Sequence, residues 1–424
     1  MILSFTLFLI LLFTGLPIYV NLGLCSFIFM FIQGFNPLVV VQRIAMSANS
    51  FTLLAAPFFI LMGNIMNNSG VTTRVFNFAN VLVGHLTGGL GHANILASVM
   101  FAGGSGTAVA DAGGLGTIEV KAMRDAGYDD DFTCAISVTS SVIVPIIPPS
   151  LPMVILAVTV EASVGRLFLG GILPGLLIAA ALMVMVGIYA RKRNYPKGPK
   201  PTFKRIWAAF KETFWALLTP IILFTGIFSG IFTPTEAAAV AAAYALVLGL
   251  FIYKEIKIKD LPKVFLATCE TTGVVLALVM TANIFGYVLS VSQVPQAMTQ
   301  VLLSLAENKL LLLVIINLFL LFTGMFMEGI ALILILSPIL VPVMISIGIN
   351  ETHACMIIIL NLMIGVVTPP VGVVLFVIAN IAKVPFEKVT RATLPFLIPL
   401  LIVLVMVTYI PGVTTFLPNL VFGK

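Results

Sequence analysis

Two segments combine a pair of adjacent prolines with a hydroxyl side chain inside long apolar stretches. They are Ser140–Pro152 (SSVIVPIIPPSLP) and Ile364–Gly372 (IGVVTPPVG). Proline lacks an amide donor and clashes with the carbonyl four residues earlier, so each pair is expected to open a helix. Carbonyl oxygens freed at membrane depth are costly unless they coordinate a ligand or line a wet cavity. Such oxygens, together with hydroxyls, suit a desolvated sodium ion.

Each proline pair has a glycine-rich or acidic partner segment earlier in the chain. The partners are Phe101–Gly116 (FAGGSGTAVADAGGLG) and Phe322–Ile330 (FTGMFMEGI). The apolar run from Lys309 to Ile349 would reach roughly 60 Å as one helix, about twice the hydrocarbon thickness, so a hairpin is predicted there. Gly/Pro-interrupted segments at corresponding positions of two halves point to the binding site of a secondary transporter. One such pair alone would more often be a kink.

Two acids lie in apolar surroundings within the partner segments, Asp111 and Glu328. Ionisable residues inside a membrane are candidates for function by default. For both, two interpretations stay open: an ion or substrate role, or a structural hydrogen bond at the end of a hairpin. The acidic cluster at Asp125 and 129–131 lacks the spacing of a calcium loop and is interpreted as a solvated loop.

The composition describes the elements that must hold these segments. The chain has 424 residues and a formal net charge of +6, with 60% hydrophobic and only 9% charged residues. The mean hydropathy is +1.17. Too little charge is available to cover a soluble sphere, which excludes a cytosolic domain, a nucleic-acid binder and a disordered protein. The sequence therefore predicts an all-α polytopic membrane protein.

The basic residues indicate the topology. The longest polar interruption, Arg191–Lys211, holds eight basic residues, and a second cluster follows at Lys254, Lys257, Lys259 and Lys263. Both are expected in the cytoplasm by the positive-inside tendency, because two apolar segments separate them. The second of these segments begins with a capping box, Thr233-Pro234-Thr235-Glu236, and an alanine-rich run suited to close helix packing.

An internal repeat divides the chain. Adding 221 carries Phe101 onto Phe322, Pro148-Pro149 onto Pro369-Pro370, and Leu173-Pro174 onto Leu394-Pro395. This offset predicts two homologous halves. We place the first repeat at 1–190, with a hairpin near 85–118 and a broken helix at 133–160. A basic linker follows at 191–212, and the second repeat covers 213–424, with a hairpin near 309–345 and a broken helix at 353–382. The offset leaves a parallel or an inverted arrangement open.

Other chemistries have weaker support. The short G-x-S-G at Gly103–Gly106 also occurs around the nucleophile of rhomboid-type intramembrane proteases, but no histidine stands in a recognisable second motif. No phosphate loop and no dinucleotide-binding glycine pattern occurs. The four cysteines form no C-x-x-C pair, so no zinc site or disulfide framework is indicated. No catalytic residue is assigned, and the chain is not expected to be an enzyme.

Several motifs together resemble one family, the large membrane subunit of the tripartite ATP-independent periplasmic (TRAP) transporters. The resemblance covers nearly the whole chain. It rests on GSGTA at 104–108 with Asp111, AGY at 126–128, IIPPS at 146–150, FTPTEA at 232–237 and TPPVG at 368–372. It implies two inverted repeats, each with a re-entrant hairpin and an unwound transmembrane helix, in an elevator-type fold of the ion-transporter superfamily.

The resemblance also implies the site residues. The helix-breaking residues are Pro148, Pro149, Pro369 and Pro370. Two or more sodium ions would be held by oxygens of Gly103, Ser105, Val144, Ile147, Pro148, Thr323, Gly324, Gly365, Thr368 and Pro369. An organic-acid anion would lie between, near Ser105, Thr107, Asp111, Ser150, Glu328 and Thr368. Family members often carry a second serine at the first hairpin tip, where this chain has Gly106 and Thr107.

The resemblance finally implies partners and location. They are a smaller four-helix membrane subunit, expected as a separate chain, and a periplasmic substrate-binding protein. The expected function is sodium-coupled import of a C4-dicarboxylate, sialic acid or similar carboxylate across the bacterial inner membrane. The alternative is an elevator-type carrier or ion antiporter that needs no binding protein.

Overall fold

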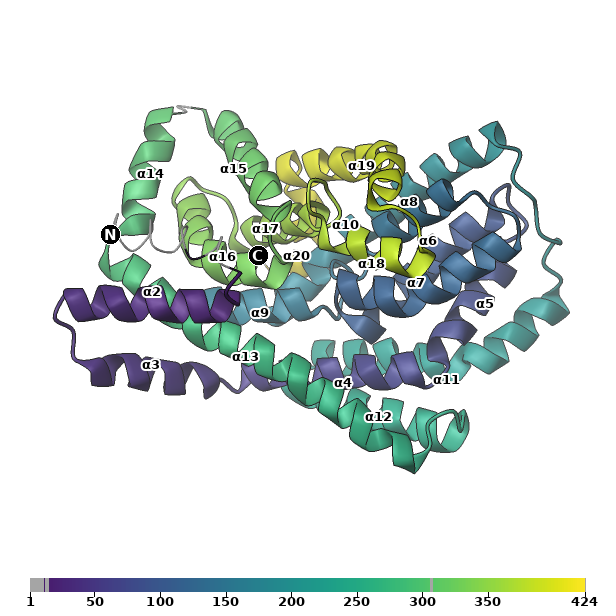
Figure 1. Cartoon of the computed structure of the whole chain (residues 1–424), viewed down its shortest axis with the longest axis horizontal. Coiled ribbons are helices and arrows are strands. Elements are labelled where there is room, and N and C mark those ends of the chain that lie inside the picture. Colours follow the sequence, from purple (N-terminus) through teal and green to yellow (C-terminus); the bar gives the residue numbers. More distant parts are fainter. Residues whose placement is uncertain (1–10, 12–14, 306–307, 424) are drawn as a thin grey trace.

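The protein is entirely helical over the part that the structure describes. A computed structural model gives Leu11, residues 15–305 and residues 308–423, and contains no strand within these ranges. Figure 1 shows the helices spread along one long axis, with the second-half helix α13 crossing beneath the others. The all-α prediction is confirmed.

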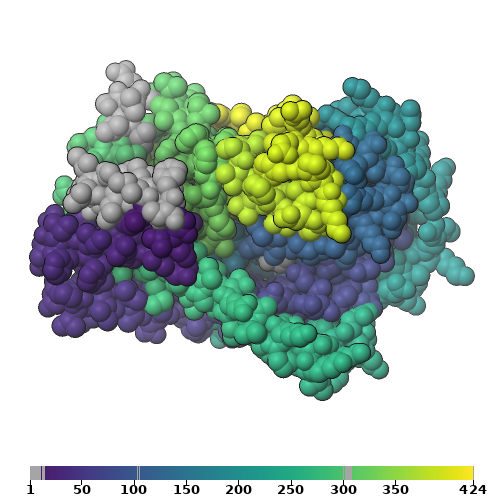
Figure 2. Space-filling model, in the orientation of Figure 1, coloured from purple at the N-terminus to yellow at the C-terminus, as the bar shows by residue number. Residues whose placement is uncertain are grey.

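The helices include several that can cross a membrane. Among the described residues, six are long and apolar enough, or seven if the bent pair α3 (Pro37–Ala48) and η1–α4 (Thr52–Asn68) counts as one span. This pair bends by 56° at its junction. Large apolar side chains are exposed on outer helices, for example Phe31 and Leu420. In Figure 2 the N-terminal helices and the C-terminal helices occupy separate parts of the visible face. An apolar outer surface of this kind is suited to lipid or to other membrane helices.

Two groups of helices frame the segments with the predicted site. The first-half group comprises α2 (Ile18–Ile32), α3, α4 (Ala55–Asn68) and α5 (Val71–Val83). The second-half group comprises α11 (Phe203–Phe228), α12 (Pro234–Val247), α13 (Leu261–Val291) and α14 (Val294–Leu305). The two groups pack together, since α4 contacts α12 and α13, and α2 and α3 contact α13.

Helix α12 forms as the sequence predicts. The Thr233 hydroxyl accepts a hydrogen bond from the Glu236 amide (3.3 Å), and the Glu236 carboxylate accepts one from the Thr233 amide (2.8 Å). These reciprocal bonds satisfy two amides that would otherwise lack partners at a helix start. One face of α12 is buried against α4 and consists of small side chains: Ala237, Ala238, Ala241, Ala242 and Ala245. Small residues let the two backbones approach closely.

The glycine-rich segments each join two helices. The first pair is α6 (Gly89–Ser105) and α7 (Ala108–Asp125), and the second is α15 (Lys309–Gly324) and α16 (Gly329–Ser346). The long apolar run after Lys309 is therefore two helices, as its length predicts. We call residues 105–107 tip 1 and residues 324–328 tip 2.

The two proline-pair segments interrupt helices. Helix α8 (Asp130–Ser140) is separated from α9 (Leu151–Val160) by residues 141–150, which we call break 1. Helix α17 (Glu351–Gly365) is separated from α18 (Val373–Ala382) by residues 366–372, which we call break 2. Both Pro-Pro peptide bonds are cis. The chain continues into α10 (Val164–Lys192) after the first pair, and into α19 (Phe386–Tyr409) and α20 (Gly412–Phe422) after the second.

The helix starts keep the spacing that the sequence repeat has. Helices α7 and α16 begin at 108 and 329, and helices α8 and α17 begin at 130 and 351. Both differences are 221 residues (329 − 108 and 351 − 130). The residues that precede these four helices, Thr107, Asp129, Glu328 and Asn350, are all polar and occupy N-cap positions in extended backbone.

Helix α10 shows how the corresponding elements are oriented. Near its end, the Tyr189 ring stacks on Phe132, two residues into α8, at 6.5 Å. Near its beginning, a Cβ on Gly170 would lie 3.1 Å from the Thr352 side chain, one residue into α17. Gly170 and Tyr189 are 19 residues apart, which is roughly 28 Å along a helix. The starts of α8 and α17 therefore lie at opposite ends of α10.

Candidate functional site

Break 1 is buried throughout. All ten residues from 141 to 150 are buried, although none is in a helix. Ser150 closes the segment: its hydroxyl donates to the Pro145 carbonyl and accepts from the Met153 amide at the start of α9 (3.4 Å). Ser150 is therefore the N-cap of α9. The segment is held in place by this hydroxyl and by tight packing.

Several carbonyl oxygens of break 1 have no partner. Within the described residues, those of Ile143 and Pro145 accept hydrogen bonds, from Ile147 (2.9 Å) and from Ser150. No described donor reaches the carbonyls of Val144, Ile147 or Pro148. Buried carbonyls are normally satisfied, so such a group indicates a missing ligand or water. These three are the break-1 residues that the resemblance implies as sodium ligands.

Tip 1 lies against break 1. Gly106 has a φ of +67°, which only glycine adopts readily, and a Cβ there would meet the amide nitrogen of Leu151 at 3.4 Å. Thr107 follows as the N-cap of α7, where its hydroxyl accepts from the Ala110 amide (3.2 Å). Gly103 and Ser105 are in α6, but their side-chain surroundings lie outside what the structure describes. Their predicted sodium and substrate roles stay predictions.

Tip 2 and break 2 touch through their backbones. A Cβ on Gly365 would lie 2.6 Å from the Gly324 Cα, and a Cβ on Gly324 would lie 3.0 Å from the Gly365 Cα. Neither position has room for a side chain. A hydrogen bond from the Gly372 amide to the Met325 carbonyl (3.2 Å) joins the same two segments. Gly324 and Gly365, which are both predicted sodium ligands, are thus brought together.

Thr368 occupies the middle of break 2. Its amide donates to the Gly365 carbonyl (2.9 Å), and its hydroxyl donates to the Ile364 carbonyl (2.7 Å). The hydroxyl oxygen keeps its acceptor lone pairs, and no described donor reaches the carbonyls of Thr368 or Pro369. Thr323 instead donates its hydroxyl back to Phe319 (3.0 Å) in α15. Break 2 therefore offers the same kind of unclaimed oxygens as break 1.

The two halves exchange partners around the breaks. Helix α18 packs against α7, and helix α9 packs against α16. The Arg124 guanidinium at the end of α7 donates to the Ala382 carbonyl at the end of α18, so these helices run in the same direction. Helices α9 and α16 also run together, because Thr159 and Pro338, eight and nine residues from their starts, line one cavity.

Four helices therefore begin at the breaks and tips. They are α7, α9, α16 and α18, and Figure 1 shows them in the middle of the molecule. Each helix start carries about half a positive charge and unsatisfied amides. Helix starts of this kind attract anions. The arrangement can hold cations on the carbonyls of the breaks and an anion facing the helix starts.

The two acids predicted from the sequence have different surroundings. Glu328 is the N-cap of α16, and its carboxylate accepts from the Ala331 amide (3.1 Å). Glu328 is thus engaged by its own helix. Asp111 is in the first turn of α7, is 1% exposed, and accepts from the Ser98 hydroxyl at 3.4 Å. A structural hydrogen bond is present at both acids, and their substrate roles stay predictions.

Sequence analysis missed a third buried acid. Glu119 is 1% exposed and accepts from the Asn94 side chain (2.7 Å), which also donates to Ser137 (2.8 Å). Glu119 stands eight residues after Asp111, which places both on one face of α7. That spacing was the available signal. No group of three or more His, Cys, Asp or Glu residues suited to a metal occurs among the described residues.

The interpretation of residues 129–131 as a solvated loop is wrong. Arg193, just after α10, forms two hydrogen bonds to the Asp131 carboxylate (2.7 and 2.8 Å) and one to Asp129 (3.0 Å). The Arg193 guanidinium lowers the pKa of Asp131 below its usual range. Tyr195 donates to Asp129 (2.7 Å), and burial with this bond raises the pKa of Tyr195 to about 12.

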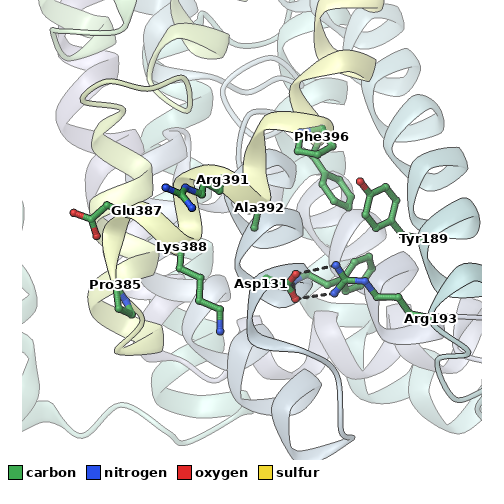
Figure 3. Close-up of a pocket in the computed structure, with 11 residues that line it drawn as sticks. Asp131, Tyr189, Arg193, Pro385, Glu387, Lys388, Arg391, Ala392 and Phe396 are labelled. Atoms are coloured by element: carbon green, nitrogen blue, oxygen red, sulfur yellow. Dashed lines mark hydrogen bonds and ion pairs between the residues drawn. The ribbon is translucent and has the colours of Figure 1, made fainter.

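A charged pocket of about 540 Å³ surrounds this ion pair, between α8, α10 and α19. Figure 3 shows Asp131 and Arg193 joined on its floor, with Lys388 and Arg391 of α19 reaching its rim. The pocket lies at the end of α10 that leads into the basic linker. It is therefore separate from the breaks and tips.

A family model decides the identity of this fold. Residues 5–413 match the model of the tripartite ATP-independent periplasmic transporter, DctM component. The chain belongs to this family. The resemblance seen in the motifs is thereby confirmed, and the chain is a large permease subunit of the TRAP type, in agreement with its membrane-spanning helices.

Named TRAP permeases are similar over almost the whole chain. The sialic acid TRAP transporter large permease protein SiaM of Vibrio cholerae is 46% identical over 97% of both chains. The sialic acid TRAP transporter permease protein SiaT of Haemophilus influenzae is 44% identical over 97% of this chain and 67% of its own length. The C4-dicarboxylate large permease protein DctM of Pseudomonas aeruginosa is 40% identical over 88% of this chain and 87% of its own. All three are named as permeases, not as enzymes.

A solved structure has a similar fold. The YdaH transporter of Alcanivorax borkumensis superimposes with a TM-score of 0.61 over 88% of this chain and 87% of its own. Its sequence is only 14% identical. The similarity therefore concerns the fold alone.

Proposed function

We propose that this TRAP permease subunit imports a small organic-acid anion together with sodium ions. The observation that carries the proposal is the pairing of unclaimed carbonyls with helix starts: break 1 and break 2 each leave buried oxygens without donors, next to four helix N-termini. Oxygens of this kind favour a hard cation, and helix N-termini favour a carboxylate. One site could then hold both ions, each stabilising the other.

Sialic acid is the substrate to test first. The two relatives named for sialic acid are 46% and 44% identical, and the relative named for C4-dicarboxylates is 40% identical. Both substrate classes carry carboxylates, which the helix starts suit equally well. The substrate would lie near Thr107, Ser150 and Thr368, with Ser105 and Asp111 close by on the first hairpin.

We further propose that the two halves are inverted repeats. The common offset of 221 residues between helix starts supports a duplication. The contacts of α8 and α17 with opposite ends of α10 support the inversion, because equivalent helices of a parallel repeat would begin on one side. The hairpins and broken helices would form the mobile unit of an elevator, moving against the frame of α2–α5 and α11–α13.

The family also suggests the surroundings of the subunit. We propose that it works in the bacterial inner membrane with a small membrane subunit and a periplasmic binding protein that delivers the anion. The relative SiaT, of which this chain matches 67%, carries additional sequence that could correspond to such a subunit. The basic linker after α10 would lie in the cytoplasm.

Reconstituted transport tests the proposal. The subunit is placed in liposomes with the small subunit and the binding protein, and uptake of radiolabelled sialic acid and succinate is measured under an inward sodium gradient. We expect uptake of one acid, abolished when potassium replaces sodium. Undiminished uptake in potassium would refute sodium coupling. Full uptake without the binding protein would instead favour a self-sufficient carrier.

A further inference from the structure

The first hairpin contains a buried polar cluster that the proposed sodium and anion sites do not use. It joins three helices through Asn94 of α6, Glu119 of α7 and Ser137 of α8. The Asn94 amide nitrogen donates to the Glu119 carboxylate (2.7 Å) and to the Ser137 hydroxyl (2.8 Å). All three side chains are at most 1% exposed. The cluster therefore has no contact with water or lipid in this conformation.

The cluster continues toward tip 1 through a second acid. Ser98 is one turn after Asn94 on α6, and its hydroxyl donates to Asp111 (3.4 Å). Helices α6 and α7 are thus joined by two successive rungs, Asn94 with Glu119 and Ser98 with Asp111. The two carboxylates are close enough for their charges to interact. They form one electrostatic unit.

The cluster lacks donors. Within the described residues, one oxygen of each carboxylate and the side-chain oxygen of Asn94 are buried without a hydrogen-bond partner. The Asn94 oxygen belongs to the same amide that bridges Glu119 and Ser137, so it lies in the cluster. The Thr133 hydroxyl, one turn before Ser137 on α8, is also buried and unpartnered. The missing element is therefore positively charged or a donor of hydrogen bonds.

No cation of the protein meets this need. In the described part of the chain, neither Asp111 nor Glu119 has an ion pair. The helices packed against α7 are α5, α6, α8 and α18. Their titratable or charged residues, followed by those of α7 itself, are Arg74, His92, Asp130, Asp131 and Cys134, and then Lys121, Arg124 and Asp125.

The basic members of this set are engaged elsewhere or point away. Arg74 pairs with Glu255 (3.2 Å) and Arg124 with Asp130 (2.6 Å). Lys121 is exposed at the surface. His92 stands two residues before Asn94, about 200° around α6, and so faces another direction. Two ionised carboxylates would therefore share a dry site with no counter-charge, which is strongly unfavourable.

We propose that Glu119 and Asp111 hold a proton between them, so that the first hairpin contains a proton-binding site in addition to the sodium and anion sites. Two neighbouring buried carboxylates cannot both ionise easily, and one retains its proton. The proton supplies the missing donor and lowers the charge of the cluster from two to one. It comes from water and returns to it when the hairpin opens.

The folded protein would then bind one more proton than the unfolded chain at neutral pH, where free carboxylates are ionised. Stability that depends on a proton bound only in the folded state decreases as pH rises. For a single proton, the ratio of folded to unfolded protein falls roughly tenfold for each unit of pH above the release of that proton. Glu119→Gln keeps the shape of the protonated acid and removes the exchange, so it should flatten this dependence.

Infrared spectroscopy of the purified subunit in detergent tests the proposal without sodium or transport. We expect the carbonyl stretch of a protonated carboxylic acid at pH 7, lost in Glu119→Gln and retained in Glu212→Gln, which changes an exposed acid on α11. Asp111→Asn provides the same reading if Glu119→Gln does not fold. Absence of the band from the unaltered protein at pH 7 would overturn the proposal. So would its persistence in both variants of the pair. Failure of sodium-driven uptake would leave this result unchanged, because the spectrum requires no transport.

Discussion

The contact between Gly324 and Gly365 provides the most direct test of the second predicted sodium site. In Gly365→Ala the added methyl would lie 2.6 Å from the Gly324 Cα, 2.7 Å from its carbonyl carbon and 3.0 Å from its oxygen. Carbon atoms pack at about 3.5–4.0 Å, so tip 2 must move away from break 2 by about 1 Å. The neighbours are backbone atoms, which cannot rotate out of the way.

This displacement should weaken sodium binding. Overpacking of this kind costs about 1–3 kcal/mol. If the cost falls on the sodium-bound form, the sodium concentration for half-maximal stabilisation rises about five- to 150-fold. Gly324→Ala should have a smaller effect in the same direction, because its methyl would lie 3.0 Å from the Gly365 Cα.

The assay is thermal unfolding of the purified subunit at increasing sodium concentration, with potassium keeping the ionic strength constant. A ligand that binds only the folded state raises the unfolding temperature according to its dissociation constant. Gly187→Ala is the matched control, since a Cβ at this position in α10 meets no atom within 4 Å. A sodium midpoint in Gly365→Ala equal to that of Gly187→Ala would refute the reasoning.

Two further predictions concern ion pairs and caps. Arg193→Gln should cost about 1 kcal/mol of unfolding free energy near neutral pH. Because Arg193 lowers the pKa of Asp131, that contribution exists above the ordinary carboxyl value of 3.8 and is lost as pH falls below it, so unfolding curves of Arg193→Gln and the Arg191→Gln control should converge in acid. A difference that persists at low pH would contradict this. Glu328→Ala should cost about 1 kcal/mol through loss of the cap on α16, and Glu328→Gln less, since it keeps an acceptor for the Ala331 amide. Equal losses in a denaturation series would mean that charge, not the cap, is what matters.

Local chemistry explains why much of the site was predictable. The proline pairs interrupt their helices because proline cannot donate and clashes with the preceding turn, whatever surrounds it. Thr233 and Glu236 cap α12 because both partners lie within three residues. The break and tip positions follow in the same way from prolines and glycines close in sequence.

Contacts between distant segments were not predictable in this manner. Asp131 and Arg193 are 62 residues apart, and their charges alone gave no reason to pair them in preference to water. Glu119 resembles a surface acid in the sequence, being followed by Lys121 and Arg124, yet it is buried against Asn94. A single residue in a helix does not reveal which neighbouring helix will cover it.

The sequence by itself determined that the chain is helical and lies in a membrane, that helices are interrupted at residues 141–150 and 366–372, and that the pattern recurs after 221 residues. These properties depend on composition and on interactions within a few residues. Only the tertiary structure decided that Gly324 meets Gly365, that α18 lies beside α7, and that two acids share a closed cluster. Burial and pairing depend on which helices pack together, and packing joins residues that the chain keeps far apart.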